Sequence, residues 1–220
     1  MTLEIGNWDF KHIMEVFIYI FQFAILFLSI MIHEISHGSM ALALGDSTAK
    51  DMGRLTFNPI KHFDLWGTFL LPLLMLFATQ GRMFFGWAKP VPFNPYNLKN
   101  PKRDAGLIGL AGPASNLVVA CFFGGLIRLL PHLGIASSST IISIFDLIMY
   151  LNLMLMVFNL IPIPPLDGSR ILYAILPRSA EKFIFSVERY GIFFLMMIIF
   201  FGAPYLSFVI NFLAKIISGQ

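Results

Sequence analysis

Long apolar stretches separated by short polar segments dominate this sequence. Stretches without Asp, Glu, Lys or Arg span residues 65–81, 105–127, 129–145, 147–166 and 190–214. A helix of about 20 such residues crosses the ~30 Å hydrocarbon core of a bilayer. The pattern therefore predicts an all-α polytopic membrane protein, a bundle of about four to six transmembrane helices with a broken helix and a re-entrant or extended segment.

Several of the expected spans have clear boundaries. Residues 13–44 predict one long helix, and residues 104–130 predict the next clear span. A further span runs from about residue 141 to Asn159, where a proline-rich segment must break it. Residues 183–217 form one kinked span, or two short ones divided by a Gly-Ala-Pro sequence.

Two segments between the first two clear spans are not typical of ordinary crossings. Residues 65–80 are apolar but short, and Gly67 and Pro72 interrupt them. The stretch Trp87–Pro95 carries three prolines within six residues. This spacing excludes helix and predicts extended backbone of the kind found at a sheet edge.

Composition supports the membrane class and excludes others. Of the 220 residues, 57% are apolar and only 12% are charged, whereas an average soluble domain has about 25% charged residues. The net charge of +3 comes from basic residues in loops between spans, where they set orientation, and it does not indicate nucleic-acid binding. The single cysteine, Cys121, lies in an apolar span, which excludes a disulfide within the chain and a cysteine-based metal site.

A pair of histidines in the first span carries the strongest chemical signal. His33 and His37 stand four residues apart, so both rings lie on one face of a helix. This spacing lets two histidines bind one Zn²⁺, while Glu34 projects close enough to act on the metal-bound water. Three ionisable groups on an otherwise apolar helix are costly in lipid and indicate a functional site.

A catalytic zinc ion usually takes three protein ligands, so a third ligand is needed. The remaining candidates are His12, His62, His132 and the acidic side chains. Asp167 is the best of them, because it follows a 20-residue charge-free run and a Pro-x-Pro-Pro segment that must break the helix. The alternative is that Asp167 caps the helix that follows it. His62 is expected to tie a turn rather than to bind metal.

Three motifs resemble those of one protease family. The chain is similar to the site-2 protease family of intramembrane zinc metalloproteases in the His-Glu-x-x-His sequence at 33–37, the Gly-Pro-Ala-Ser-Asn sequence at 112–116, and the Asn-x-x-Pro-x-Pro-x-Leu-Asp-Gly sequence at 159–168. The resemblance covers roughly residues 30–176 and implies cleavage of transmembrane or membrane-tethered protein substrates within the bilayer.

The resemblance also implies roles for individual residues. His33, His37 and Asp167 would bind one Zn²⁺ per chain, and Glu34 would be the catalytic base. The residues implied to hold the substrate or the oxyanion, or to lie beside the active site, are Asn159, Asn116 and Gly112.

Many members of this family carry an inserted PDZ-type domain or a CBS pair, and this chain has no room for either. We therefore expect a minimal form, a single membrane-embedded protease domain over 1–220, with a catalytic core at about 13–176 and peripheral helices at 183–217. A transmembrane substrate hides its carbonyls in helical hydrogen bonds and must unwind locally. The stretch Trp87–Pro95 then either pairs with the unwound substrate as an added strand or is a plain surface loop.

Other classes of membrane protein fit the pattern less well. A metal-ion transporter needs ionisable groups at several depths, whereas here they converge on one site. A metal-binding scaffold need not carry Glu34. A different membrane zinc protease would need a downstream glutamate ligand, and the late candidates Glu181 and Glu188 lie in no motif.

Topology follows from the requirement that the ligands meet. The loops 46–64 and 177–182 must then lie on one face, so one intervening segment must fail to cross. The shortest is 65–80, which we expect to re-enter. This arrangement gathers eleven basic residues on one face. The positive-inside bias then places the active site nearer the cytoplasmic face. We expect a multi-pass protein of a prokaryotic cell membrane.

Overall fold

The computed structural model describes residues 10–70, 74 and 89–219, and within these residues every regular element is helical. The α-helices are α1 (Phe10–Ala43), α2 (Thr48–Asp51), α3 (Pro59–His62), α5 (Pro101–Leu129), α6 (Thr140–Asn159), α7 (Asp167–Ile175), α8 (Glu181–Met197) and α9 (Ala203–Ser218). Short 3-10 turns lie at Pro95–Asn97, Leu130–Leu133 and Arg178–Ala180, and π-helical turns lie at Leu65–Leu70 and Ile198–Gly202.

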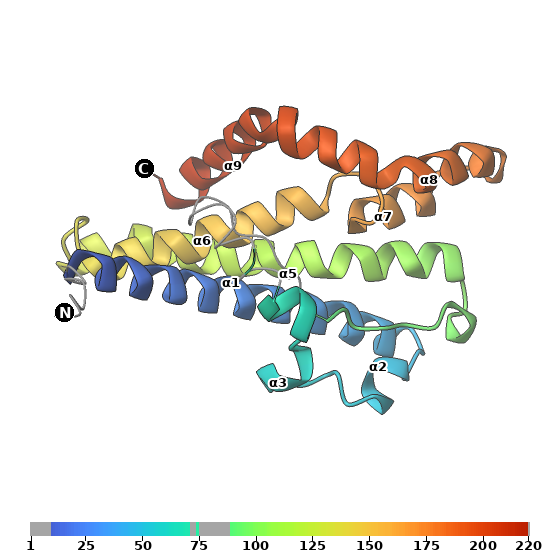
Figure 1. Ribbon diagram of the computed structural model, residues 1–220, viewed down its shortest axis with the longest axis horizontal. Helices are drawn as coiled ribbons and strands as arrows, with labels where there is room; N and C mark the ends of the chain where they lie inside the picture. Colours follow the sequence, from blue (N-terminus) through green and yellow to red (C-terminus); the bar gives the residue numbers. More distant parts are fainter. Residues whose placement is uncertain (1–9, 71–73, 75–88, 220) are drawn as a thin grey trace, which may run out of the picture.

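Four helical segments of the described chain are long and apolar enough to cross a membrane: Phe17–Ala43, Pro101–Leu133, Thr140–Asn159 and Val187–Ser218. These segments confirm the all-α polytopic class. The last one begins within α8 and continues through a π-helical turn and α9 as one bent span (Figure 1). A proline in the first turn of α9 accounts for the bend, because its ring disturbs the preceding hydrogen bonds.

Helix α5 is the centre of the bundle. It packs against α1, α6, α7 and α9, and Figure 1 shows α1, α5 and α6 lying side by side along their length. A buried apolar cluster joins α5 to α6 and α9, with Ile127, Met149, Leu153 and Ile210 among its members. Many large apolar side chains elsewhere on the helices are exposed, as expected for surfaces that face lipid.

The chain leaves α1 and returns to the same end of the bundle before α5. The carboxylate of Asp46, directly after α1, accepts hydrogen bonds from the backbone N–H of Asn94 at 2.7 Å and from Nδ2 of Asn97 at 2.7 Å. At the same end, Nζ of Lys102 donates to the carbonyl of Leu176. The loop after α1 and the loop after α7 therefore lie together, as the meeting of the ligands requires.

The segments between α1 and α5 are described in part. Residues 89–94 contain no helix, and Asn94 has an extended φ of −107° and ψ of 110°. Trp87 and Ala88 lie outside the described residues, and so does most of 65–80, so the predicted re-entry stays a prediction. His62 is fully buried, and its Nε2 donates to the carbonyl of Thr56 at 2.8 Å, which confirms that it ties a turn.

The break between α6 and α7 brings Asp167 back toward α1. Helix α6 ends at Asn159, and α7 begins with Asp167 itself, with Leu166 as the residue before the helix. A side chain at Gly168 would collide with the carbonyl of Leu160, so glycine permits this close return. No capping hydrogen bond from a side chain is present at this helix start. The side chain of Asp167 instead points toward α1 and contacts its histidines.

Candidate metal centre

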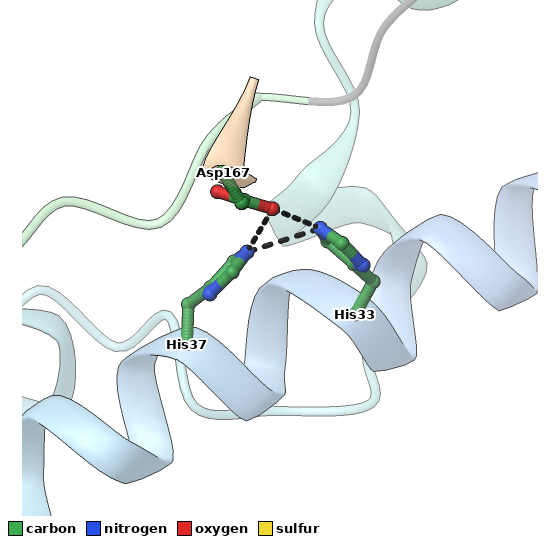
Figure 2. Close-up of side chains that lie close together, drawn as sticks. All are labelled: His33, His37 and Asp167. Atoms are coloured by element: carbon green, nitrogen blue, oxygen red, sulfur yellow. Dashed lines mark hydrogen bonds and ion pairs between the residues drawn. The ribbon is translucent and has the colours of Figure 1, made fainter. Parts of the chain in front are cut away.

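Two histidine rings and one carboxylate converge at the interior face of α1. His33 and His37 project from adjacent turns of this helix, and Asp167 points between them from the first residue of α7 (Figure 2). The two Nε2 atoms are 3.0 Å apart, and Oδ2 of Asp167 lies 3.0 Å from the first and 3.1 Å from the second. All three residues are buried.

The outer nitrogen of each ring is held by a hydrogen-bond acceptor. Nδ1 of His37 lies 2.6 Å from the carbonyl oxygen of Ile108. A carbonyl only accepts, so this Nδ1 carries the proton and donates it. Nδ1 of His33 lies 2.6 Å from Oδ1 of Asn116 and donates in the same way. Both Nε2 atoms are therefore left with their lone pairs facing Asp167.

This donor set fits a zinc ion. Three lone-pair atoms at 3.0–3.1 Å from one another repel unless a cation lies among them. Two neutral imidazoles and one carboxylate form a three-ligand set of the kind found at catalytic zinc sites, which keep a further position for water. The partners on Nδ1 are the outer contacts that orient such ligands. Within the described residues, these side chains form the one group able to hold a metal ion.

Gly112 on α5 faces the two ligand nitrogens of the histidines. A Cβ atom at this position would lie 2.5 Å from Nε2 of His37 and 2.6 Å from Nε2 of His33. Any side chain there would occupy the space between the ligand atoms. Glycine therefore lets α5 approach α1 at this level and keeps the centre open.

Glu34 lies beside the histidines in sequence and is half-buried. Its Oε2 accepts a hydrogen bond of 2.8 Å from the backbone N–H of Val91, in the extended segment 89–94. Among the described residues, no hydrogen bond engages its second carboxylate oxygen, Oε1, which we assign to the attacking water below.

The other predicted residues are placed as follows. Asn116 is fully buried, and its amide contacts His33. Asn159 is the last residue of α6, where its Nδ2 donates to the carbonyl of Leu155 at 3.0 Å. The alternative that Asp167 only caps its own helix is not supported, because its carboxylate contacts the two histidines.

Sequence analysis missed three residues near the centre. Asn152 and Ser29 are buried and hydrogen bond to one another and to Asn116. Arg170 lies with Nη1 at 3.7 Å from Oδ1 of Asp167 and with its guanidinium over the ring of Phe93. Asn152 and Ser29 could have been suspected from the sequence, because each is a polar residue within a charge-free apolar stretch.

Known proteins resemble this chain over most of its length. The profile of peptidase family M50 matches residues 122–203. A protein of Bacillus subtilis named "Putative zinc metalloprotease YwhC" is 39% identical over 190 residues, which is 84% of this chain and 81% of that protein. A protein of Mycolicibacterium smegmatis named "Putative zinc metalloprotease Rip2" is 29% identical over 180 residues, covering 82% of this chain and 66% of that protein.

A shorter match joins this chain to "Putative zinc metalloprotease Rip3" of Mycobacterium tuberculosis, with 40% identity over 80 residues, 36% of this chain and 20% of that protein. No solved structure matches the chain significantly. The identity to the Bacillus protein extends over most of both chains, and the buried His-His-Asp centre has the ligands that such an enzyme needs. The chain belongs to peptidase family M50, the site-2 protease family, and is a multi-pass membrane zinc metalloprotease.

Proposed function

We propose that this enzyme cleaves transmembrane or membrane-tethered protein substrates within the bilayer, with one Zn²⁺ held by His33, His37 and Asp167. The observation that carries the proposal is that the two Nε2 atoms, on a helix apolar enough to span a membrane, lie within 3.1 Å of each other and of Oδ2 of Asp167. Buried ionisable groups in such a helix are rarely retained without function.

The residues of the chain divide the chemistry between them. Zinc, when bound, supplies Lewis-acid activation of the attacking water and of the scissile carbonyl. Glu34 takes the proton of the water through Oε1 and delivers it to the nitrogen of the leaving amine. The Val91 N–H holds Oε2 of Glu34 and so fixes the direction of the carboxylate.

We assign different tasks to the remaining motif residues. Asn116 positions His33, since its amide oxygen accepts from the ring. Gly112 keeps the space among the ligand atoms free. Asn159, at the end of α6, is proposed to stabilise the oxyanion of the tetrahedral intermediate with its amide, once it turns away from the carbonyl of Leu155.

The extended segment supports a role in substrate binding. A transmembrane helix must unwind before its carbonyls can react, and the freed backbone groups then need partners. Residues 89–94 lie next to the base, through Val91. Pro90 and Pro92 have no N–H, so the strand edge that they share offers only carbonyl acceptors to a substrate.

The site is proposed to lie nearer the cytoplasmic face of a prokaryotic cell membrane. His37 stands six residues before the end of α1, which is about 9 Å at the rise of an α-helix. Basic residues lie in the loops and in the helix start at that end, among them Lys50, Lys99 and Lys102. Positively charged segments of this kind stay on the cytoplasmic side.

The test compares purified wild-type enzyme with Glu34→Gln, in detergent or liposomes, for zinc content and for cleavage of a synthetic transmembrane peptide. Both proteins should hold about one zinc ion per chain, and the variant should lose turnover by roughly 100-fold or more. Zinc flux into liposomes without cleavage, unchanged in the variant, would instead indicate a metal-ion transporter.

A further inference from the structure

We propose that Asn152 is a positioning residue of the zinc site, which acts through Asn116 to determine how His33 faces the metal. The proposal rests on the zinc site proposed above and adds to it a residue of α6 that is two hydrogen bonds away from His33. No sequence motif of the chain includes this asparagine.

Asn152 and Asn116 lie where α1, α5 and α6 meet. Both are fully buried, with 0% of their surface exposed. Nδ2 of Asn116 donates to Oδ1 of Asn152 at 2.9 Å and approaches the carbonyl of Ser29 at 3.4 Å. Nδ2 of Asn152 donates to Oγ of Ser29 at 2.9 Å and to the carbonyl of Ile148 at 2.8 Å.

These contacts fix the direction of each amide in turn. The carbonyl of Ile148 can only accept, so it must face the nitrogen of Asn152. The oxygen of Asn152 then faces Asn116, which must present its own nitrogen.

The last step of the chain reaches the metal ligand. With its nitrogen committed to Asn152, Asn116 turns its oxygen toward His33. An amide oxygen cannot donate, so Nδ1 of His33 carries the proton and Nε2 keeps its lone pair for the metal. The carbonyl of Ile148 on α6 thus determines, through the two amides, that Nε2 of His33 on α1 is the nitrogen free to bind the metal.

The second histidine needs no such chain. Nδ1 of His37 donates directly to the carbonyl of Ile108, which has no alternative orientation. The partner of His33 is an amide, which could rotate and present its nitrogen instead. In that arrangement Nε2 of His33 would carry the proton and could not bind zinc. The contact of 2.9 Å with Asn152, supported by the longer one of 3.4 Å to the carbonyl of Ser29, excludes this state.

The cost of this arrangement argues against a purely packing role. A buried amide in an apolar interior is unfavourable unless all its groups are bonded. An aliphatic side chain of similar volume would pack equally well between the helices. In this part of the chain, both amides have every donor and acceptor occupied, and the one ring that they reach belongs to a proposed metal ligand.

The first test measures zinc affinity of the whole enzyme by competition with a chelator. Asn152→Leu removes the amide at similar volume, and zinc should bind about 10- to 100-fold more weakly. Asn152→Asp keeps an oxygen toward Asn116 in either protonation state and should retain most of the affinity. Leu153→Ala, at an equally buried neighbouring position, should lower thermal stability but leave zinc affinity unchanged. Equal zinc affinity in wild type and Asn152→Leu would overturn the proposal.

The second test locates the His33 proton in the absence of metal. Nitrogen-15 NMR of the metal-free wild-type protein should show the His33 proton on Nδ1, and Asn152→Leu should move part of it to Nε2. A wild-type proton on Nε2 would overturn the proposal even if zinc binds. If the wild-type enzyme binds no zinc but His33 carries its proton on Nδ1, the positioning of His33 by Asn152 and Asn116 is supported, whereas the proposed function fails.

Discussion

The backbone N–H of Val91 donates a hydrogen bond of 2.8 Å to Oε2 of Glu34, so the extended segment 89–94 holds the proposed catalytic base directly. The two residues are 57 positions apart in sequence. Because the donor is a backbone group, the identity of the side chain at position 91 does not predict this contact. A substitution at position 91 removes this hydrogen bond only if the new residue has no backbone N–H, as in proline.

Val91→Pro removes that donor. Position 91 precedes Pro92 and is therefore restricted to the extended region that proline also adopts, so the backbone should tolerate the change. A hydrogen bond to a charged group contributes about 1.5–3 kcal/mol, so kcat should fall roughly 10- to 100-fold while zinc content stays constant. Val91→Ala is the matched control, because it also loses the buried side chain but keeps the N–H. Equal kcat in the two variants would show that the bond does not position Glu34.

Asp167→Ala tests the third metal ligand. Loss of the carboxylate leaves only two nitrogen ligands, which should weaken zinc binding by at least about 100-fold, since outer-contact changes alone cost about 10- to 100-fold. Zinc content measured by atomic absorption after dialysis, together with peptide cleavage, checks this outcome. Full retention of zinc and activity would remove Asp167 from the ligand set. His33→Ala and His37→Ala should behave as Asp167→Ala does.

Gly112→Ala tests the close approach of α5 to the histidines. The new methyl group would lie 2.5–2.6 Å from both Nε2 atoms, so the rings must move and zinc should be lost together with activity. Gly125→Ala on the same helix is the control, since its Cβ would meet nothing within 4 Å. The two variants should share the gain in helix propensity, about 1 kcal/mol. A zinc-replete, active Gly112→Ala enzyme would contradict the described packing.

Asp46 provides a pH dependence at the loop end of the bundle. Burial by itself raises the pKa of this carboxyl, but hydrogen bonds from Thr48, Asn94 and Asn97 outweigh it and hold the pKa below its ordinary value. The folded-state pKa is thus lower than the unfolded one, near 3.9. The ionised carboxylate therefore contributes stability above about pH 4, and this contribution is lost as the pH falls through the folded-state pKa.

Asp46→Asn should remove this dependence. The variant loses one acceptor for the half-buried donors around position 46, which costs about 1 kcal/mol at neutral pH. Its thermal stability should change less than that of wild type between about pH 6 and pH 3, the window set by carboxylate titration. Hydrogen exchange at the amide of Asn94 provides a local measurement. An identical acid dependence in the two proteins would exclude Asp46 as its source.

The return of the chain to one end of the bundle predicts its topology. Asp46 contacts Asn94 and Asn97, so Lys50→Cys and Lys99→Cys, each in a Cys121→Ser background, should be labelled from the same side of the membrane. A membrane-impermeant maleimide applied to right-side-out and inside-out vesicles distinguishes the sides. Labelling of the two positions from opposite faces would refute the re-entry of 65–80.

Features that depend on local geometry are predictable from the order of the residues alone. The four-residue spacing of His33 and His37 places both rings on one face of any helix, so the metal pair was predictable without a fold. The span boundaries followed from hydropathy, since crossing a bilayer requires a continuous apolar helix. Asp167 follows a proline-broken span, where a helix cap is the ordinary explanation, and the histidine pair is what favours a metal ligand there.

How the helices meet became clear from the folded chain alone. Asp167 lies 134 positions from His33. The other decisive contacts also join different elements: Gly112 to the histidines, Val91 to Glu34, and Asn152 to Asn116. Apolar surfaces in lipid do not specify their partners, because lipid tails are as apolar as the side chains. Close packing and buried hydrogen bonds select the arrangement instead, and a single neutral asparagine in an apolar span does not show in the sequence which residue it will contact.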